Sequence, residues 1–341
     1  MRIDLNTPDD LDRIPKNNDA PKDESKRRIL TGREILEMTL PKVEYAVDPL
    51  ITKPGLWLMN GSQKAGKTMF AAQTALSMNA GVDLMERFAT GPATGAMFIE
   101  QDDPSGVGAL QPILQRTTLP VDLDRFYSIA GSNFQIEPGF IEFLEKEITA
   151  RGLGVVVLDS YTALRGPRNG SSDLVKAESL DLGLLDALAK RTGCLILLIH
   201  HSSKGSAALD WSDRSAGTYA MGAHSEGQVF ISRFQELPGN APERLVQIRG
   251  RHVEGAEMVI RFNVERLSYD FVLEGPAASS YPTILQMKSE FGTGTFSPKN
   301  LCGATGMSKA SAHRIIGRLM ASNLASKVAF GEYRLALEIG A

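Results

Sequence analysis

The residues best suited to chemistry lie in one short run, Gly61-Ser62-Gln63-Lys64-Ala65-Gly66-Lys67-Thr68. The run matches GxxxxGK followed by Ser or Thr, the spacing of a phosphate-binding loop. Its two glycines allow successive N–H groups to surround phosphate oxygens, and the helix that continues through Met69 adds its positive end. We expect Lys67 to reach the β- and γ-phosphates of ATP and the Thr68 hydroxyl to bind Mg²⁺.

Acidic residues follow two apolar runs further along the chain. Asp159 comes directly after Leu153–Leu158, where a carboxylate would sit beside the phosphate loop and hold Mg²⁺ through water. Glu100 and Asp102 close the run that starts at Ala96. Hydrolysis needs a carboxylate that orients water, and we expect these two side chains to share a strand face, because strand side chains alternate.

Two histidines, His200 and His201, follow the apolar run Cys194–Ile199. A polar group at that strand end would lie at the edge of the nucleotide site, where it could sense the γ-phosphate. The sequence does not distinguish between the two histidines.

These residues need a scaffold that brings strand ends together. Apolar strands alternate with helices from Gly55 to Ile199, a pattern typical of an α/β fold with a mostly parallel sheet covered on both faces. The expected helix over 173–191 carries Leu180, Leu184 and Leu188 on one face. Later runs predict an extension of antiparallel strands: Gln228–Phe234, Arg244–Arg249, Glu257–Phe262 and Leu267–Val272.

The chain divides into three predicted parts. Residues 1–28 are polar and predict a flexible arm, residues 29–275 form the α/β domain, and a small-residue linker precedes a third part over 281–341. Three helices and a terminal hairpin in this last part predict a winged helix-turn-helix. Its third helix would place Lys309, His313, Arg314 and Arg318 outward, and Ala312, Ile315, Ile316, Leu319 and Met320 toward the core.

Composition limits the class of protein. The 341 residues are 43% hydrophobic and 23% charged, which suits a large folded domain. Net charge is −3, but residues 277–341 carry seven Lys/Arg against three Asp/Glu, which is compatible with nucleic-acid binding there. Two cysteines without metal spacing, and the absence of a long apolar run or a signal peptide, predict a cytoplasmic protein without a membrane span.

The order of these motifs, from the phosphate loop to His200-His201-Ser202-Ser203-Lys204-Gly205 and the later strands, resembles the RecA/DnaB superfamily. Within it, the chain looks most like the RepA-type hexameric helicases of plasmids and phages, over about Val47–Val272. The resemblance implies a RecA-like core and a ring, expected to be a homo-hexamer. It also implies that Asp102, in Asp102-Asp103-Pro104, is the catalytic base; Glu100 remains the alternative, since the family usually has Glu where this chain has Asp.

The resemblance also assigns candidate partners. Loops at Tyr161–Ser172 and Ser202–Gly222 would face single-stranded DNA in the ring channel, and Arg249 and Arg251, sharing a strand face, would enter a neighbour's active site. Arg214 is a competing arginine finger. The winged helix could bind duplex DNA or dock a protein. A replicative DNA helicase is the main hypothesis; a RecA/KaiC-like recombination or regulatory ATPase and an ATP-switched DNA-binding regulator remain open.

Overall fold

The computed structural model describes residues 29–39, 42–103, 105–130, 133–166, 172–201 and 222–336. The chain comprises two compact units, Met1–Lys42 and Val43–Ala341. The first contains α1 (Gly32–Glu37). Thr31 and Glu34 form a reciprocal capping box at the N-terminus of this helix. The arm predicted over residues 1–28 lies outside the described residues.

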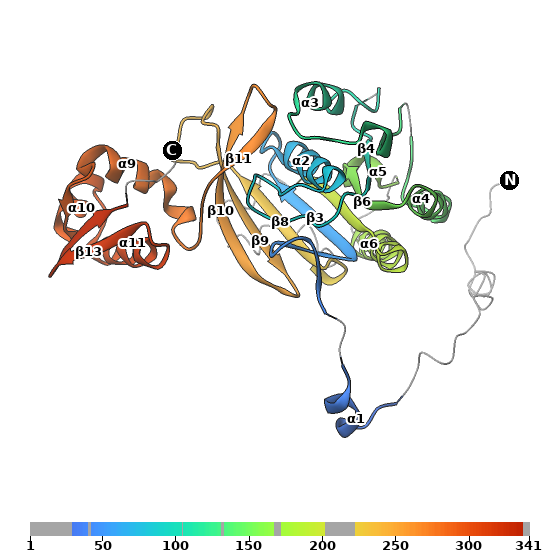
Figure 1. The fold of residues 1–341 in the computed structure, drawn as a ribbon, viewed down its shortest axis with the longest axis horizontal. Helices are drawn as coiled ribbons and strands as arrows, with labels where there is room; N and C mark the ends of the chain where they lie inside the picture. The colour runs from blue at the N-terminus through green and yellow to red at the C-terminus, as the bar shows by residue number, and fades with distance from the viewer. Residues whose placement is uncertain are drawn as a thin grey trace. The chain divides into compact units, whose positions relative to one another are not determined.

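A nine-stranded sheet forms the centre of the second unit, in the order β11-β10-β9-β8-β3-β7-β6-β4-β5 (Figure 1). The parallel part is confirmed: β3, β7, β6, β4 and β5 run parallel to their neighbours. Its strands are β3 (Gly55–Gly61), β4 (Gly95–Glu100), β5 (Phe126–Ser128), β6 (Leu153–Asp159) and β7 (Leu195–His201). A small hairpin, β1 (Glu44–Val47) and β2 (Ile51–Lys53), precedes it.

Helices pack on both faces of this sheet, because its central strands are apolar on both sides. On one face, α2 (Lys67–Ala80) and α3 (Leu110–Arg116) share an apolar cluster with Trp57 and Met59 of β3. On the other face, α4 (Pro138–Arg151), α5 (Tyr161–Leu164) and α6 (Ser172–Thr192) pack around Leu56 and Leu58.

The apolar face predicted for α6 is wrong at one position. Leu180 is 64% exposed, whereas Leu182, Leu185 and Leu188 are fully buried against the sheet and α4. Two overlapping leucine stripes exist on this helix, and only the packing partner selects between them. None of the helices in the described parts of the chain is long and apolar enough to cross a bilayer.

The antiparallel extension consists of β8 (Gly227–Ser232), β9 (Glu243–Gly250), β10 (Val253–Asn263) and β11 (Ser268–Glu274). The prediction that these four strands run antiparallel to one another is confirmed. On its other side β8 runs parallel to β3 of the core. The strand that joins the extension to the parallel sheet therefore directs its C-terminal end toward the phosphate loop.

The C-terminal elements follow a single turn of 3₁₀ helix over Ala278–Ser280. They are α9 (Tyr281–Phe291), β12 (Thr295–Phe296), α10 (Pro298–Thr305), α11 (Lys309–Ala321), β13 (Ala325–Ala329) and β14 (Glu332–Leu335), with a three-stranded sheet ordered β12-β14-β13. Ser297 and Ser308 cap α10 and α11 as predicted.

The core of these elements is continuous with the large sheet. One apolar cluster contains Phe234, Val259 and Leu273 together with the buried residues of α9, α10 and α11. Phe234 follows β8, Val259 lies on β10 and Leu273 lies on β11. The prediction that Met320 faces this core is wrong, since it is 37% exposed, while Ile316 and Leu319 are buried.

Candidate active site

The phosphate loop connects β3 to α2. Gly61 is the last residue of β3, and Gly66 caps α2 in the left-handed region with φ 101°. A Cβ at Gly61 would lie 2.3 Å from the Ile231 carbonyl oxygen, and one at Gly66 would lie 1.7 Å from the Tyr269 hydroxyl oxygen. Both positions therefore require glycine for the close approach of neighbouring chain as well as for backbone conformation.

Lys67 and Thr68 form the first turn of α2. The Lys67 side chain is buried, and its Nζ donates to the carbonyl oxygens of Gly61 and Ser62, each at 2.9 Å. The Thr68 hydroxyl donates to Asp159 Oδ2 at 2.6 Å. This last contact puts Asp159 beside the phosphate loop, where the sequence predicts it. The roles of Lys67 at phosphate and of Thr68 at Mg²⁺ stay predictions.

Burial shifts the acid–base behaviour of this pair of charges. Desolvation lowers the pKa of Lys67 to about 8, although Asp159 and Asp102 act in the opposite direction. Desolvation raises the pKa of Asp159 to about 6; the nearby acids add to this rise, and the Thr68 hydrogen bond and Lys67 oppose it. The end of the loop thus holds a buried amine, and the adjacent strand end holds a buried carboxyl group.

Glu100 and Asp102 both lie near Asp159, but only Glu100 belongs to strand β4. Glu100 is the last residue of β4, pairs in register with Asp159, and accepts a hydrogen bond from the Ala109 N–H at 3.0 Å. Asp102 lies past the strand end, exposed, and accepts from the Ser160 hydroxyl at 2.9 Å. The expectation that they share a strand face is wrong, because β4 ends at Glu100. Burial raises the pKa of Glu100.

Two arginines that the sequence reasoning missed contact the outer side of the loop. Arg233, just after β8, donates to the Lys64 carbonyl oxygen at 2.9 Å, and Arg244 of β9 donates to the Ala65 carbonyl oxygen at 3.1 Å. No local motif marks either residue. The available signal was their place at strand ends that meet the loop edge, which requires the strand order.

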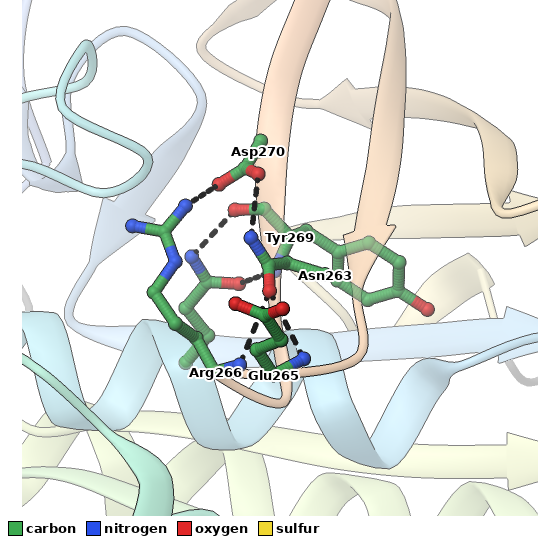
Figure 2. A network of polar contacts seen from close by, with 6 residues as sticks. Asn263, Glu265, Arg266, Tyr269 and Asp270 are labelled. Carbon is green, nitrogen blue, oxygen red and sulfur yellow. Dashed lines mark hydrogen bonds and ion pairs between the residues drawn. The ribbon is translucent and has the colours of Figure 1, made fainter.

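Tyr269 is a third missed contact. Its main-chain N–H and carbonyl bond both ends of the Gln73 side chain, at 2.7 and 2.9 Å, and this ties β11 to α2. Figure 2 shows these bonds beside the turn between β10 and β11, where Asn263 and Arg266 both bind Asp270. The hairpin therefore fixes the Tyr269 ring whose hydroxyl lies against Gly66.

The remaining predicted residues lie elsewhere or outside the described residues. His200 is half-buried, with its ring centroid 6.0 Å from that of Tyr161; the side chain of His201 and all of Arg214 lie outside the described residues. The predicted loop over Tyr161–Ser172 begins with α5, and residues 167–171, like 202–221, are not described.

The prediction that Arg249 and Arg251 share a strand face is wrong. Arg249 is exposed on β9, but β9 ends at Gly250, and Arg251 lies in the two-residue turn before β10. Gly250 pairs with Gly227 of β8, which in turn pairs with Trp57 of β3. Trp57 lies four positions before Gly61, so the turn is on the order of 13 Å from the end of the sheet that carries the phosphate loop. Arg251 therefore belongs to the opposite end of its own sheet.

The donor set fits ATP with Mg²⁺. The loop offers main-chain N–H groups and an ammonium to phosphates, and Thr68 with Asp159 offers the oxygen ligands that Mg²⁺ prefers. The Thr68 hydroxyl and the Asp159 carboxylate are in contact at 2.6 Å, so these two residues would together hold the cation, which would neutralise phosphate charge.

One family of known proteins has a model that covers these residues. The model of the AAA domain family matches residues 21–207, more than half of the chain, and the match includes the phosphate loop and Asp159. A solved structure described as an ATPase domain is similar at 12% sequence identity and a TM-score of 0.49, over 64% of this chain and 85% of that one. The chain belongs to the AAA domain family, and it contains a P-loop ATPase domain.

Proposed function

We propose that this ATPase is a DNA-dependent motor, a RepA-like replicative helicase that acts as a homo-hexameric ring on single-stranded DNA. The observation that carries the proposal is that one chain holds both an ATPase site and a cationic helix. Lys309, His313 and Arg314 are exposed on one side of α11. A chain that both binds DNA and hydrolyses ATP can use the free energy of hydrolysis to move along the DNA.

ATP binding falls to residues of the loop itself. Main-chain N–H groups from the loop and Lys67 would hold the phosphates, and Thr68 and Asp159 would hold Mg²⁺. Mg²⁺, when bound, neutralises phosphate charge and thereby favours attack by water. His200, the last residue but one of β7, is our candidate for sensing the γ-phosphate, with His201 as the alternative.

Asp102 is the better candidate for the catalytic base. Glu100 is occupied by the Ala109 N–H at the start of α3, so it serves as an anchor for that helix. Asp102 is exposed beyond the strand end, and the Ser160 hydroxyl holds one of its oxygens next to Asp159. A base must reach water in line with the phosphate, and an exposed carboxylate next to the metal position meets that need.

A neighbouring subunit would complete the site. Arg251 lies at the end of the sheet opposite its own loop, so it can serve an ATP only in another copy of the chain. An arginine finger is worth roughly 10³–10⁵ in rate. Arg251→Ala and Lys67→Ala subunits should each be inactive, and mixing them should restore part of the ATPase activity. An inactive mixture of demonstrably mixed oligomers would exclude Arg251, and Arg249 or Arg214 would be tested next.

The C-terminal elements would form a winged helix that binds duplex DNA. Three helices and the β13–β14 hairpin follow one another as such a module requires, and the exposed residues of α11 suit phosphate contacts. Arg318 is less available, because it donates to the Ser279 and Ser280 hydroxyls at 3.4 Å. Arg314→Glu should weaken duplex binding most at low salt, where phosphate contacts contribute most.

The decisive experiment is strand displacement. The purified chain is incubated with a labelled forked duplex, ATP and Mg²⁺, beside Lys67→Ala, and its mass is measured with and without ATP. Displacement by the wild type alone, from a ring-sized oligomer, supports the helicase. DNA-stimulated hydrolysis without displacement would instead indicate a recombination-type ATPase. ATP-dependent assembly without DNA-stimulated turnover would indicate an ATP-switched regulator.

A further inference from the structure

Arg244 is an unusual arginine. It is only 9% exposed, and burial lowers the pKa of its guanidinium. Its Nε donates to the Ala65 carbonyl oxygen at 3.1 Å, and its Nη1 donates to the carbonyl oxygens of Ala241 and Glu243 at 2.6 and 2.7 Å. Within the described residues no carboxylate forms an ion pair with it. A buried cation held by carbonyls alone is costly unless a further anion lies nearby.

The carbonyls that these arginines bind belong to the phosphate loop. The Ala65 carbonyl shares a peptide group with the Gly66 N–H, and the Lys64 carbonyl, bound by Arg233, shares one with the Ala65 N–H. A peptide group is planar and trans, so its carbonyl and its N–H point in opposite directions. The Ala65 N–H is used within the loop, where it donates to the Ser62 carbonyl oxygen at 3.2 Å. Holding the Ala65 carbonyl on the outside of the loop directs the Gly66 N–H toward its inside.

A donor at the carbonyl also polarises the peptide group. Chains of hydrogen bonds strengthen one another, so a charged donor on the Ala65 carbonyl makes the Gly66 N–H a stronger donor to an anion. Arg244 would therefore act on a bound phosphate in two ways: through the orientation of the loop, and through a positive charge just outside it.

We propose that Arg244, assisted by Arg233, is a positioning residue that holds the P-loop in its phosphate-binding shape from the outer side. The inference rests on the proposed ATP site and adds to it a part supplied by the antiparallel extension. Both arginines donate to main-chain carbonyl oxygens, and those on the loop belong to Lys64 and Ala65, so their effect should fall on binding of the phosphate chain rather than on the chemical step.

The neighbourhood of Arg244 supports this role. Glu243 forms an ion pair with Arg261 at 3.2 Å, and Arg261 also donates to the Tyr281 hydroxyl at 3.3 Å. Arg261 thus links the start of β9 to β10, on which it lies, and to α9. A rigid anchor is what a positioning residue needs, because a guanidinium on a mobile loop could not hold the carbonyl in one place.

The test compares nucleotide affinity with stability. Fluorescent ATP and ADP analogues are titrated into the full-length wild type, Arg244→Met, Arg244→Lys and Arg87→Met, and the unfolding temperature of each is measured without nucleotide. Arg87 is the control, because it pairs with Glu274 and lies over the Phe271 ring at 4.4 Å, with no contact to the loop. All four proteins carry an intact set of residues inside the loop.

We expect Arg244→Met to weaken ATP and ADP by the same factor, roughly tenfold or more, since a charge-assisted hydrogen bond is lost and both nucleotides contain the phosphates that the loop surrounds. Arg244→Lys should recover part of this loss, and Arg87→Met should keep wild-type affinity even where it lowers the unfolding temperature. Should Arg244→Met fail to fold, Arg233→Met replaces it, because Arg233 is exposed and its loss leaves no buried gap.

Wild-type nucleotide affinity in Arg244→Met, or in Arg233→Met where that variant replaces it, would overturn the inference. An equal loss of affinity in Arg87→Met would overturn it too. A loss for ATP but not ADP would also overturn it, by assigning the arginines to the γ-phosphate. A wild type that binds neither nucleotide would instead refute the ATP site, and the role inferred for Arg244 with it.

Discussion

Replacing Gly66 with alanine tests the packing of the P-loop against the antiparallel extension. Gly66 has φ 101°, and an added Cβ would lie 1.7 Å from the Tyr269 hydroxyl oxygen. A left-handed conformation costs a non-glycine residue roughly 1–2 kcal/mol. Displacing the ring to relieve the overlap costs about 1–3 kcal/mol more. We therefore expect Gly66→Ala to destabilise the protein by about 2–5 kcal/mol in total.

The Tyr269→Phe background separates these two costs. Without the hydroxyl, the next atom of the ring, Cζ, lies 3.0 Å from the added Cβ, which is tight but close to a tolerable contact. Most of the overlap should vanish while the backbone strain remains. In a double-mutant cycle we expect the two substitutions to couple by about 1–3 kcal/mol, the size of the overpacking cost.

The assay is urea unfolding of the four proteins of the cycle, without nucleotide, followed by circular dichroism. Gly139→Ala is the control, because no atom lies within 4 Å of a Cβ at that position of α4. It should change stability by less than about 1 kcal/mol. If Gly66→Ala costs the same in both backgrounds, the hydroxyl does not press on the loop, and the reasoning is refuted.

Three further outcomes follow from the site. Lys67→Ala should abolish ATP hydrolysis without changing the circular dichroism spectrum, and normal turnover would remove the P-loop assignment. Asp102→Asn should stop hydrolysis while ATP still binds, whereas Glu100→Gln should reduce hydrolysis less; the reverse ranking in a phosphate-release assay would make Glu100 the base. Burial raises the pKa of the Cys194 thiol to about 12, so at pH 8 it stays protonated, and a disulfide reagent should modify only Cys302 until the protein is unfolded.

The parts of the site that the sequence predicts are those encoded locally. The P-loop is read from its spacing because Gly61, Lys67 and Thr68 lie on one continuous strand–loop–helix unit. Asp159 and Glu100 follow from a general property of parallel sheets, whose strands all present their C-terminal ends at one edge. Their register partnership in β4 and β6 realises that expectation.

The parts that the sequence does not predict depend on strand order and on where strands end. Arg244 looks like any charged residue near a strand end until β9 is known to lie beside β8, which lies beside β3. Arg251 was assigned to the face of Arg249 because alternation assumes that the strand continues. The turn after Gly250 removes that assumption. A single glycine within a strand pattern indicates a bulge as readily as a turn, so Gly250 alone does not mark the strand end.

The apolar cluster shared by Phe234, Val259 and Leu273 with the C-terminal helices has a consequence for how such proteins can be recombined. The glycine at 275 looks like a natural place to exchange the C-terminal elements for those of another protein. An exchange there would leave three apolar side chains without their partners, and the incoming segment would have to supply complementary ones. Val43–Ala341 should therefore melt as one cooperative body, and a chimaera should keep its fold only if the exchanged segment carries matching residues at Tyr281 and Ile284.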